Sequence, residues 1–171
     1  LNPHCQLRIY EVMVEAFVDG DANANHNFGY GTSHHRGDLQ GIIQSLDYIK
    51  STGSNTLWLT PIFYSIPEAF QNSNEKRLDG TGYFTSDYFQ IDPRFGTLEQ
   101  AKTLVEEAHK RGLFVLFDGV FGHHKYNIKA SPSGLLPAGN YNEVDYNDPN
   151  SRAFYQEVVT YWIKTLKIDG W

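Results

Sequence analysis

The sequence predicts an α/β fold: a parallel (β/α) barrel of TIM type, with only about the first four strands present in this chain. Segments with strand and helix periodicity alternate along the chain, which is typical of right-handed βα units in a parallel sheet. The long polar segments all follow the carboxyl ends of predicted strands, where barrel enzymes carry their active-site loops. No glycine-rich phosphate turn follows the first strand, which disfavours an open dinucleotide-binding sheet.

The predicted strands are short runs rich in strand-forming residues. Residues 7–17, LRIYEVMVEAF, alternate apolar and polar side chains, and residues 55–63, NTLWLTPIF, contain a second run that Pro61 closes. Residues 113–117, LFVLF, form an unbroken apolar run that suits a strand buried on both faces. We expect parallel strands near 8–14, 56–60, 113–118 and 168–171.

Three segments carry helical spacing. Residues 38–52 place apolar side chains at 39, 42, 43, 46 and 49, with Asp38 as a plausible N-cap. Thr97 can cap a second helix that Gly112 ends, and Pro149 stands at the start of a third. We expect helices near 39–52, 97–111 and 150–166, and long loops over 64–95 and 126–148.

Composition limits the function classes. An apolar content of 40% and a charged content of 20% are ordinary for a soluble globular protein. The net charge of −6 argues against a nucleic-acid partner, and no apolar run is long enough for a membrane span, so we expect neither partner. No signal peptide is visible, and the single Cys5 leaves the compartment open, a secreted or periplasmic location included.

The segment Gly112 to His124, GLFVLFDGVFGHH, ends the third predicted strand in chemically useful side chains. Asp118 follows the apolar run directly, and His123 and His124 come shortly after it. Carboxylates and imidazoles at the carboxyl end of a buried parallel strand lie where α/β enzymes place their chemistry. On these residues alone, a strand that simply ends in an ordinary polar turn is the favoured interpretation.

The loop after the first predicted strand carries an oxygen side chain at every second position, at Asp19, Asp21, Asn23, Asn25 and Asn27. Calcium takes about 6–8 oxygen ligands, and a loop with this spacing can wrap around one ion. Asn, Asp and Gly also dominate loops without ligands, so the spacing leaves a calcium site and a polar turn equally open.

Four motifs, in order and at matching spacing, resemble the N-terminal half of the α-amylase family, glycoside hydrolase family 13. Residues 37–49, with GDLQGII and LDYI, resemble its first barrel helix, and LWLTPI at 57–62 resembles its second strand. Residues 82–97, with GY, DY, IDP and FGT, resemble the loop that brings a tyrosine to the cleaved sugar. Residues 118–123, DGVFGH, are similar to the first conserved region of the family, Asp-x-Val-x-Asn-His.

The resemblance implies substrate-binding roles for three residues. Tyr83 matches the tyrosine that stacks on the sugar before the cleaved bond, and an aromatic face suits the C–H surface of a pyranose. His123 matches the histidine that hydrogen-bonds a hydroxyl of the same sugar, and Asp118 matches an aspartate that orders the floor of the site by pairing with an arginine on the next strand. Asp19, Asp21, Asn25 and Asp38 resemble a calcium site of the cyclodextrin glucanotransferase branch, so calcium is the implied cofactor.

The implied activity is that of a retaining α-glycoside hydrolase or transglycosylase acting on α-linked glucosides through a covalent glycosyl-enzyme. In the family, an arginine and then the nucleophilic aspartate follow the stretch that matches residues 169–171, and the acid glutamate lies on a later strand. No catalytic carboxylate is therefore expected in this span. We expect the 171 residues alone to be inactive, and the remainder of the barrel and an α-glucan to be the partners of the chain.

The resemblance also implies a domain division, with departures at three positions. Residues 1–122 match the first part of the catalytic barrel, 123–148 a short inserted segment, and 149–171 the continuation of the barrel to its fourth strand. Gly122 replaces an asparagine that often binds a second calcium ion, and Thr81 replaces a histidine that contacts sugar. Glu143 occupies a position where the family usually has aspartate, so the bond specificity cannot be read from this segment.

Two other functions are compatible with the sequence. A non-catalytic, amylase-like barrel with a binding or ancillary role would keep the fold and lose the site residues, and the joint presence of Tyr83, Asp118 and His123 counts against it. An unrelated α/β enzyme could use the pairs at 34–35 and 123–124 as zinc ligands, although adjacent histidines rarely bind one metal together.

Overall fold

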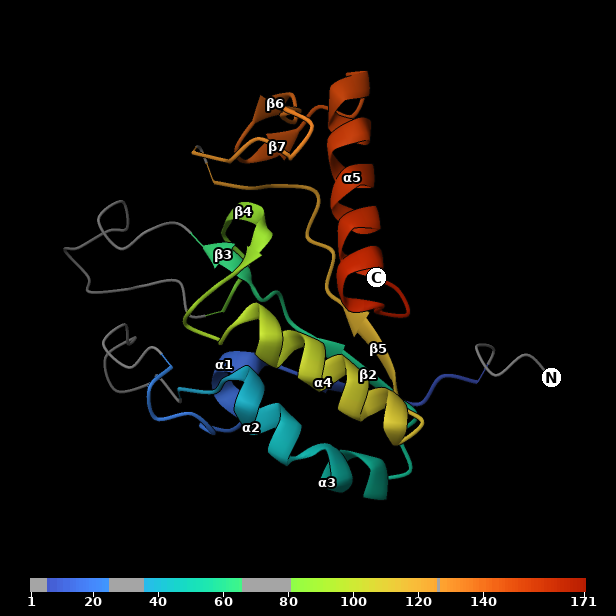
Figure 1. Cartoon of the computed structure of the whole chain (residues 1–171). Coiled ribbons are helices and arrows are strands. Elements are labelled where there is room, and N and C mark those ends of the chain that lie inside the picture. The colour runs from blue at the N-terminus through green and yellow to red at the C-terminus, as the bar shows by residue number, and fades with distance from the viewer. Residues whose placement is uncertain (1–5, 25–35, 66–80, 126) are drawn as a thin grey trace.

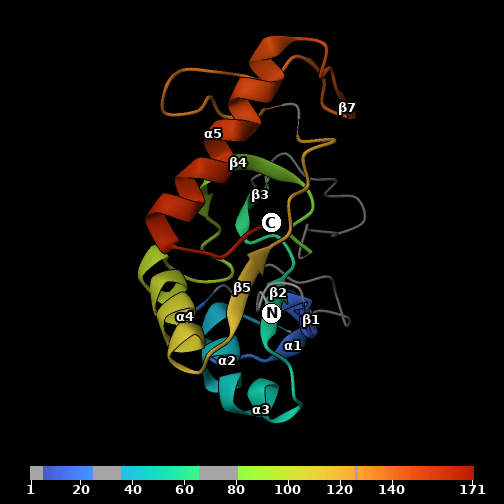
Figure 2. The same cartoon turned by 90° about the vertical axis from the view of Figure 1, so that its right-hand side faces the viewer.

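The computed structural model describes residues 6–24, 36–65, 81–125 and 127–171, and its centre is a parallel sheet of three strands. The strands β1 (Ile9–Val12), β2 (Thr56–Leu59) and β5 (Phe114–Phe117) lie side by side in the order β1-β2-β5 (Figure 2). In place of the fourth strand predicted near 168–171, the structure has one parallel bridge, between Leu116 and Gly170, which puts the end of the chain next to β5. The order follows the sequence without a reversal, which is the order of a barrel and not of a doubly wound sheet.

The register gives the sheet two different faces. Val12, Leu59 and Phe117 stand level with one another, and so do Glu11, Trp58 and Leu116 one position earlier. Because side chains alternate along a strand, each level set lies on one face. The first set is buried, whereas the second is half-buried or exposed.

Helices cover the buried face. These are α2 (Leu39–Gln44), α3 (Leu46–Ser51), α4 (Leu98–Lys110) and α5 (Pro149–Leu166). In Figures 1 and 2, α4 lies beside β5 with α2 and α3 below it, and α5 rises past the carboxyl end of β5. Ile42, Leu46, Leu104, Val105 and Val158 are among the fully buried side chains that join helices and sheet into one core.

The two later helices confirm the predicted signals. Thr97 accepts a hydrogen bond from Gln100 N while the Gln100 side chain accepts one from Thr97 N, which is a capping box. The side chain of Asp148 caps α5 and Pro149 is its first residue. Among the described residues, no helix combines the length and the apolar character needed to cross a membrane.

The first two predicted elements need correction. The strand expected near 8–14, within the alternating segment 7–17, ends at Val12, and Val14–Phe17 form the short helix α1. The backbone N–H of Val14 donates to the Thr60 hydroxyl and not to a neighbouring strand. The helix predicted over 39–52 is interrupted at Ser45, whose hydroxyl donates to the Gly41 carbonyl four residues earlier. Such back-bonding competes with regular helix geometry.

The two predicted loops contain β-hairpins. β3 (Phe63–Ser65) pairs antiparallel with β4 (Thr85–Ile91), and β6 (Gly139–Asn140) pairs with β7 (Glu143–Val144). The register of β3 with β4 is irregular, so β4 buries Thr85 and Ser86 in succession and lacks the simple alternation that marks a strand in a sequence. β6 and β7 have two residues each, too few for a periodic signal.

Asp38 joins the loop after α1 to the start of α2. Its fully buried carboxylate accepts hydrogen bonds from the backbone N–H groups of Gly41 at 2.7 Å, Asp21 at 2.9 Å and Gly20 at 3.1 Å. The predicted N-cap is thereby confirmed, and the same side chain satisfies donors from two segments.

We predict that Asp38→Ala destabilises the full-length protein by roughly 2–4 kcal/mol, because a helix cap is lost and buried N–H groups are left unpaired. A lower melting temperature of the purified protein would show this effect. Asp47→Ala is the matched control, since the Asp47 side chain is 84% exposed and bonds Arg111 at the surface. Equal melting temperatures for the two variants would contradict the assigned role.

Candidate carbohydrate-binding site

Asp118 stands at the carboxyl edge of the sheet because of strand pairing. Its backbone N–H donates to the Leu59 carbonyl at 3.1 Å, and one strand further Thr60 N–H donates to the Val12 carbonyl at 3.0 Å. The parallel register therefore continues one residue beyond the strands. As a result, the side chain of Asp118 emerges at the edge where barrel folds carry functional loops.

Tyr83 reaches this edge through a glycine that packs on the neighbouring strand. Gly82 has a φ of +85°, and a Cβ there would lie 2.0 Å from the Pro61 carbonyl oxygen, so no other residue fits this position without rearrangement. Because Pro61 lies two residues after the end of β2, this contact packs the Tyr83 loop against the carboxyl end of β2.

Tyr83 and Asp118 are bonded to each other. The Tyr83 hydroxyl donates to Asp118 Oδ2 at 2.7 Å, across 35 residues of sequence. Burial, followed by this hydrogen bond to a carboxylate, raises the pKa of Tyr83 well above its ordinary value of 10.0. The phenol consequently stays protonated at physiological pH and keeps its donor directed at Asp118.

His123 is held by the backbone of the same tyrosine. Its Nε2 lies 2.8 Å from the Tyr83 carbonyl oxygen. A carbonyl only accepts, so Nε2 carries a proton, and in the neutral ring Nδ1 is then the acceptor. The structure thus brings together Tyr83, Asp118 and His123, the three residues predicted to bind substrate.

Buried aromatic residues fix the segment that carries His123. The Tyr88 hydroxyl on β4 lies 2.7 Å from the Val120 carbonyl and 3.1 Å from the His123 carbonyl, and it donates its one proton to this pair of acceptors. The indole N–H of Trp162 on α5 donates to the Tyr88 carbonyl at 2.7 Å. Tyr88 and Trp162 are both 1% exposed, so the segment that carries His123 is hydrogen-bonded to side chains of the hydrophobic core.

Tyr83 and His123 face a hollow of about 450 Å³, a volume within the range of small-molecule sites. Asp118 is not part of its lining and reaches it only through Tyr83. The complete lining is Tyr83, Phe84, His123, His124, Lys125, Tyr141 and Asn142. Phe84, Lys125, Tyr141 and Asn142 were not predicted from the sequence, because no local pattern shows that the segments around 84, 124 and 141 meet.

Three of the four residues predicted to hold calcium, Asp19, Asp21 and Asp38, lie among the described residues. Asn25 lies outside the described residues, Asp19 is exposed, and Asp21 accepts hydrogen bonds from Asn23 N and the Gln100 amide. Both oxygens of Asp38 likewise accept hydrogen bonds, from the backbone N–H groups of Gly20, Asp21 and Gly41, so a bound cation would share these carboxylates with the hydrogen bonds or replace them. In the described part of the chain, no three His, Cys, Asp or Glu side chains form a metal-binding group.

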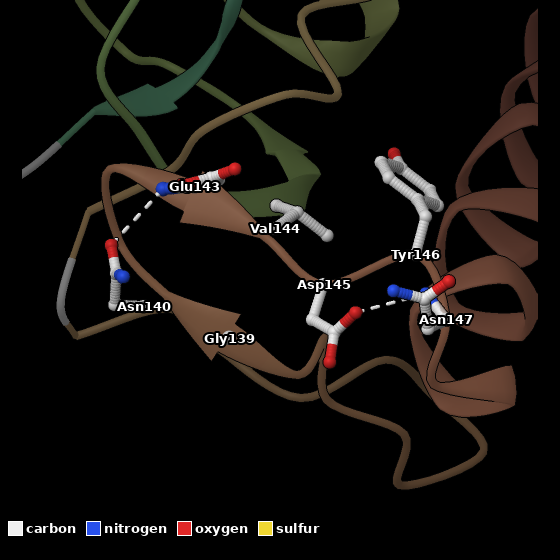
Figure 3. Close-up of a pocket in the computed structure, with 7 residues that line it drawn as sticks. All are labelled: Gly139, Asn140, Glu143, Val144, Asp145, Tyr146 and Asn147. Carbon is white, nitrogen blue, oxygen red and sulfur yellow. Dashed lines mark hydrogen bonds between the residues drawn. The ribbon is translucent and has the colours of Figure 1, made fainter.

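A second hollow, of about 400 Å³, lies at the β6–β7 hairpin and contains Glu143, the residue at the position where aspartate was expected (Figure 3). The nearby Asp145 carboxylate accepts a hydrogen bond from Asn147 N at 2.9 Å, and Asn140 Oδ1 accepts from Glu143 N at 3.1 Å. These bonds close local turns. They give the hairpin a fixed shape without forming a metal centre.

Comparison with known proteins places this geometry in a family. Residues 11–132 match the family described as "Alpha amylase, catalytic domain". A cyclomaltodextrinase of Thermoanaerobacter pseudethanolicus is 32% identical over 95% of this chain and 33% of its own length. A maltogenic alpha-amylase of Bacillus acidopullulyticus is 30% identical over 95% of this chain and 32% of its own length. The chain thus spans about a third of the length of these curated relatives.

Solved structures agree with this match. AmyP in complex with maltose is 67% identical, with a TM-score of 0.88 over 96% of this chain and 33% of that chain. The α-amylase from Geobacillus thermoleovorans, complexed with acarbose, is 32% identical, with a TM-score of 0.73 over 96% of this chain and 39% of that chain. The three parallel strands and their helices are the first part of a TIM barrel, and the chain belongs to the α-amylase family of glycoside hydrolases.

Proposed function

We propose that the full protein is a retaining α-glycoside hydrolase or transglycosylase, and that this chain supplies one wall of the sugar site before the cleaved bond. The observation that carries the proposal is the bonded set of Tyr83, Asp118 and His123 at the carboxyl edge of the sheet. These side chains come from two different loops, and their arrangement leaves an aromatic face and a ring nitrogen available at one hollow.

Each residue has a distinct part in the proposed site. The ring of Tyr83 offers a flat apolar face to the C–H surface of a glucose ring, while its hydroxyl is occupied by Asp118. His123 uses Nε2 to hold the Tyr83 backbone, so Nδ1 is the atom that can accept a hydrogen bond from a sugar hydroxyl. Asp118 is a positioning residue, since it touches Tyr83 and does not line the hollow.

The names of the relatives support an α-glucan as the substrate. The similar proteins are called cyclomaltodextrinase and maltogenic alpha-amylase, and AmyP structures contain maltose or maltotriose. A retaining mechanism needs two carboxylates about 5–5.5 Å apart, one as nucleophile and one as acid/base. The family resemblance assigns both to segments that follow Trp171, so this chain contributes substrate contacts and not the covalent step.

We predict that the full-length protein hydrolyses malto-oligosaccharides or cyclomaltodextrins and that the separately purified 171-residue chain does not. The missing nucleophile and acid are the reason for the difference. Release of reducing sugar from maltotriose, starch and cyclomaltodextrin measures both samples. Turnover by the 171 residues alone would overturn the assignment of the chemistry to the rest of the barrel, and an inactive full-length protein would favour a non-catalytic barrel.

We predict that Tyr83→Ala lowers kcat more than it raises KM, because contacts with a distorted sugar are strongest in the transition state. His123→Asn should act in the same direction and lower turnover by roughly 10- to 1000-fold. Steady-state kinetics of the full-length variants on maltotriose would give both parameters.

Two further variants make this kinetic test specific. Tyr83→Phe keeps the aromatic face and removes only the hydroxyl that bonds Asp118, so it should lose less turnover than Tyr83→Ala. Tyr48→Ala is the control, because Tyr48 lies on α3 with 59% of its surface exposed and does not line the hollow. If Tyr83→Ala performed like Tyr48→Ala, Tyr83 would not be a sugar contact.

We retain calcium as a proposal, with Asp19, Asp21, Asn25 and Asp38 as its ligands, because their oxygen atoms have the chemistry that this ion prefers. The ion would stabilise the loop that Asp38 already ties to α2. Treatment with a chelator should then lower the melting temperature of the full-length protein, and added calcium should restore it. An unchanged melting temperature in chelator would exclude the ion.

A further inference from the structure

We infer that Asp169 and His109 form a positioning pair that sets the register of the segment after α5 against β5. The pair thereby fixes where the nucleophilic carboxylate that is expected to follow Trp171 stands in the full protein. This inference rests on the proposed function and extends it to two residues outside the hollow of the sugar site. The observation behind it is that one oxygen of Asp169 bonds both β5 and α4.

Asp169 is bonded twice to the same residue of β5. Its backbone N–H donates to the Val115 carbonyl at 2.8 Å, and its Oδ2 accepts from the Val115 N–H at 2.8 Å. In a parallel sheet the N–H groups of a strand bond backbone carbonyls of its neighbours, and here a carboxylate takes that place where the segment after α5 begins to pair. A slip of one residue would break both bonds and leave a donor of the fully buried Val115 unpaired.

His109 holds the same carboxylate from the last turn of α4. Its Nε2 lies 2.8 Å from Asp169 Oδ2. An ionised carboxylate only accepts, so Nε2 carries the proton and donates it. The side chains of His109 and Asp169 are 37% and 22% exposed, so solvent only partly competes for this bond. Since α4 leads into β5 through Gly112, both donors to Asp169 belong to one helix–strand unit, and together they fix its side chain.

The chain turns sharply from α5 to reach this position (Figure 2). Lys167 ends the helix with a φ of +58°, in the left-handed region. Gly170 then lies close to β5, because a Cβ there would be 3.2 Å from Leu116 Cδ2. The Phe117 N–H donates to the Gly170 carbonyl at 3.1 Å, so the register set at Asp169 continues along the strand.

This register reaches the sugar site through Trp171. The centre of its ring system lies 5.8 Å from that of Phe117 and 5.3 Å from that of Phe121, which stands between Asp118 and His123 in the chain. Residues after Trp171 would leave β5 at the edge where Asp118 emerges. A different register would move a carboxylate on them relative to the sugar, and a displacement of about 1 Å can cost about 100-fold in rate.

Variants of the full-length protein separate positioning from binding. Asp169→Ala should lower kcat on maltotriose by about 10- to 100-fold and change KM less than about 3-fold, because the sugar contacts stay in place while the reacting carboxylate moves. Asp169→Asn should stay within about 3-fold of the unmodified protein, since its amide oxygen can take the place of Oδ2. His109→Ala should lose about 3- to 10-fold in kcat, and His109→Gln, which keeps a donor, should lose less.

Amide hydrogen exchange over residues 113–118 tests the register without any substrate. The Val115 N–H should exchange at least about 10-fold faster in Asp169→Ala than in the unmodified protein, and at an unchanged rate in Asp169→Asn. Lys102→Ala is the control, because it removes only a surface ion pair of α4, with Glu99. It should leave both the exchange rate and the kinetic constants unchanged.

Three results would overturn the positioning pair: an unchanged kcat in Asp169→Ala, an unchanged Val115 exchange rate in that variant, or a loss in Asp169→Asn as large as in Asp169→Ala. If Asp169→Ala did not fold, His109→Ala and His109→Gln would give the same comparison. An unmodified protein without activity on maltotriose would remove the proposed function and the kinetic consequence with it. The exchange rates would still decide whether Asp169 and His109 set the register.

Discussion

The arrangement of the site depends on the parallel register of β1, β2 and β5. Since Val12, Leu59 and Phe117 stand level, the three strands end together, and the next residues leave the sheet at one edge. Asp118 is the first residue after β5 and Pro61 is the second residue after β2. Asp118 accepts a hydrogen bond from the Tyr83 hydroxyl and Pro61 packs on Gly82, so both determine the position of Tyr83. A slip of one residue would move the side chains of a strand to the opposite face and separate these contacts.

Close contact between backbones joins the loop after α1 to the start of α2. A Cβ at Gly41 would lie 1.9 Å from the Val18 carbonyl oxygen, and one at Gly20 would lie 2.3 Å from Gly41 N. The glycines therefore let the loop after α1 touch the first turn of α2, where the Asp38 carboxylate gathers the N–H groups of both segments. Glycine and carboxylate act together, since backbone donors can converge on one side chain only where no Cβ keeps the segments apart.

The periodic elements could be predicted from the sequence because each of them buries one stripe or one run. Helix α4 and strand β5 were found for this reason, and their caps and end glycine lie where expected. The β3–β4 hairpin could not be found in the same way, because its pairing depends on a distant partner strand and an irregular register. The residues Tyr83, Asp118 and His123 came from the family resemblance. Their bonds to one another required the structure.

The same reasoning explains why Tyr141 could be found only in three dimensions. Its segment has no periodicity, and its place beside His123 results from backbone hydrogen bonds between residues 122–124 and the hairpin. Those bonds are reliable anchors only because residues 120–123 are themselves held from below by the buried Tyr88, which Trp162 of α5 bonds in turn. The buried side chains of Tyr88 and Trp162 thus hold residues 120–123 in place, and residues 122–124 in turn hold the β6–β7 hairpin. A loop held in this way can be exposed to solvent and still keep one arrangement, which is what preorganisation of a surface site requires.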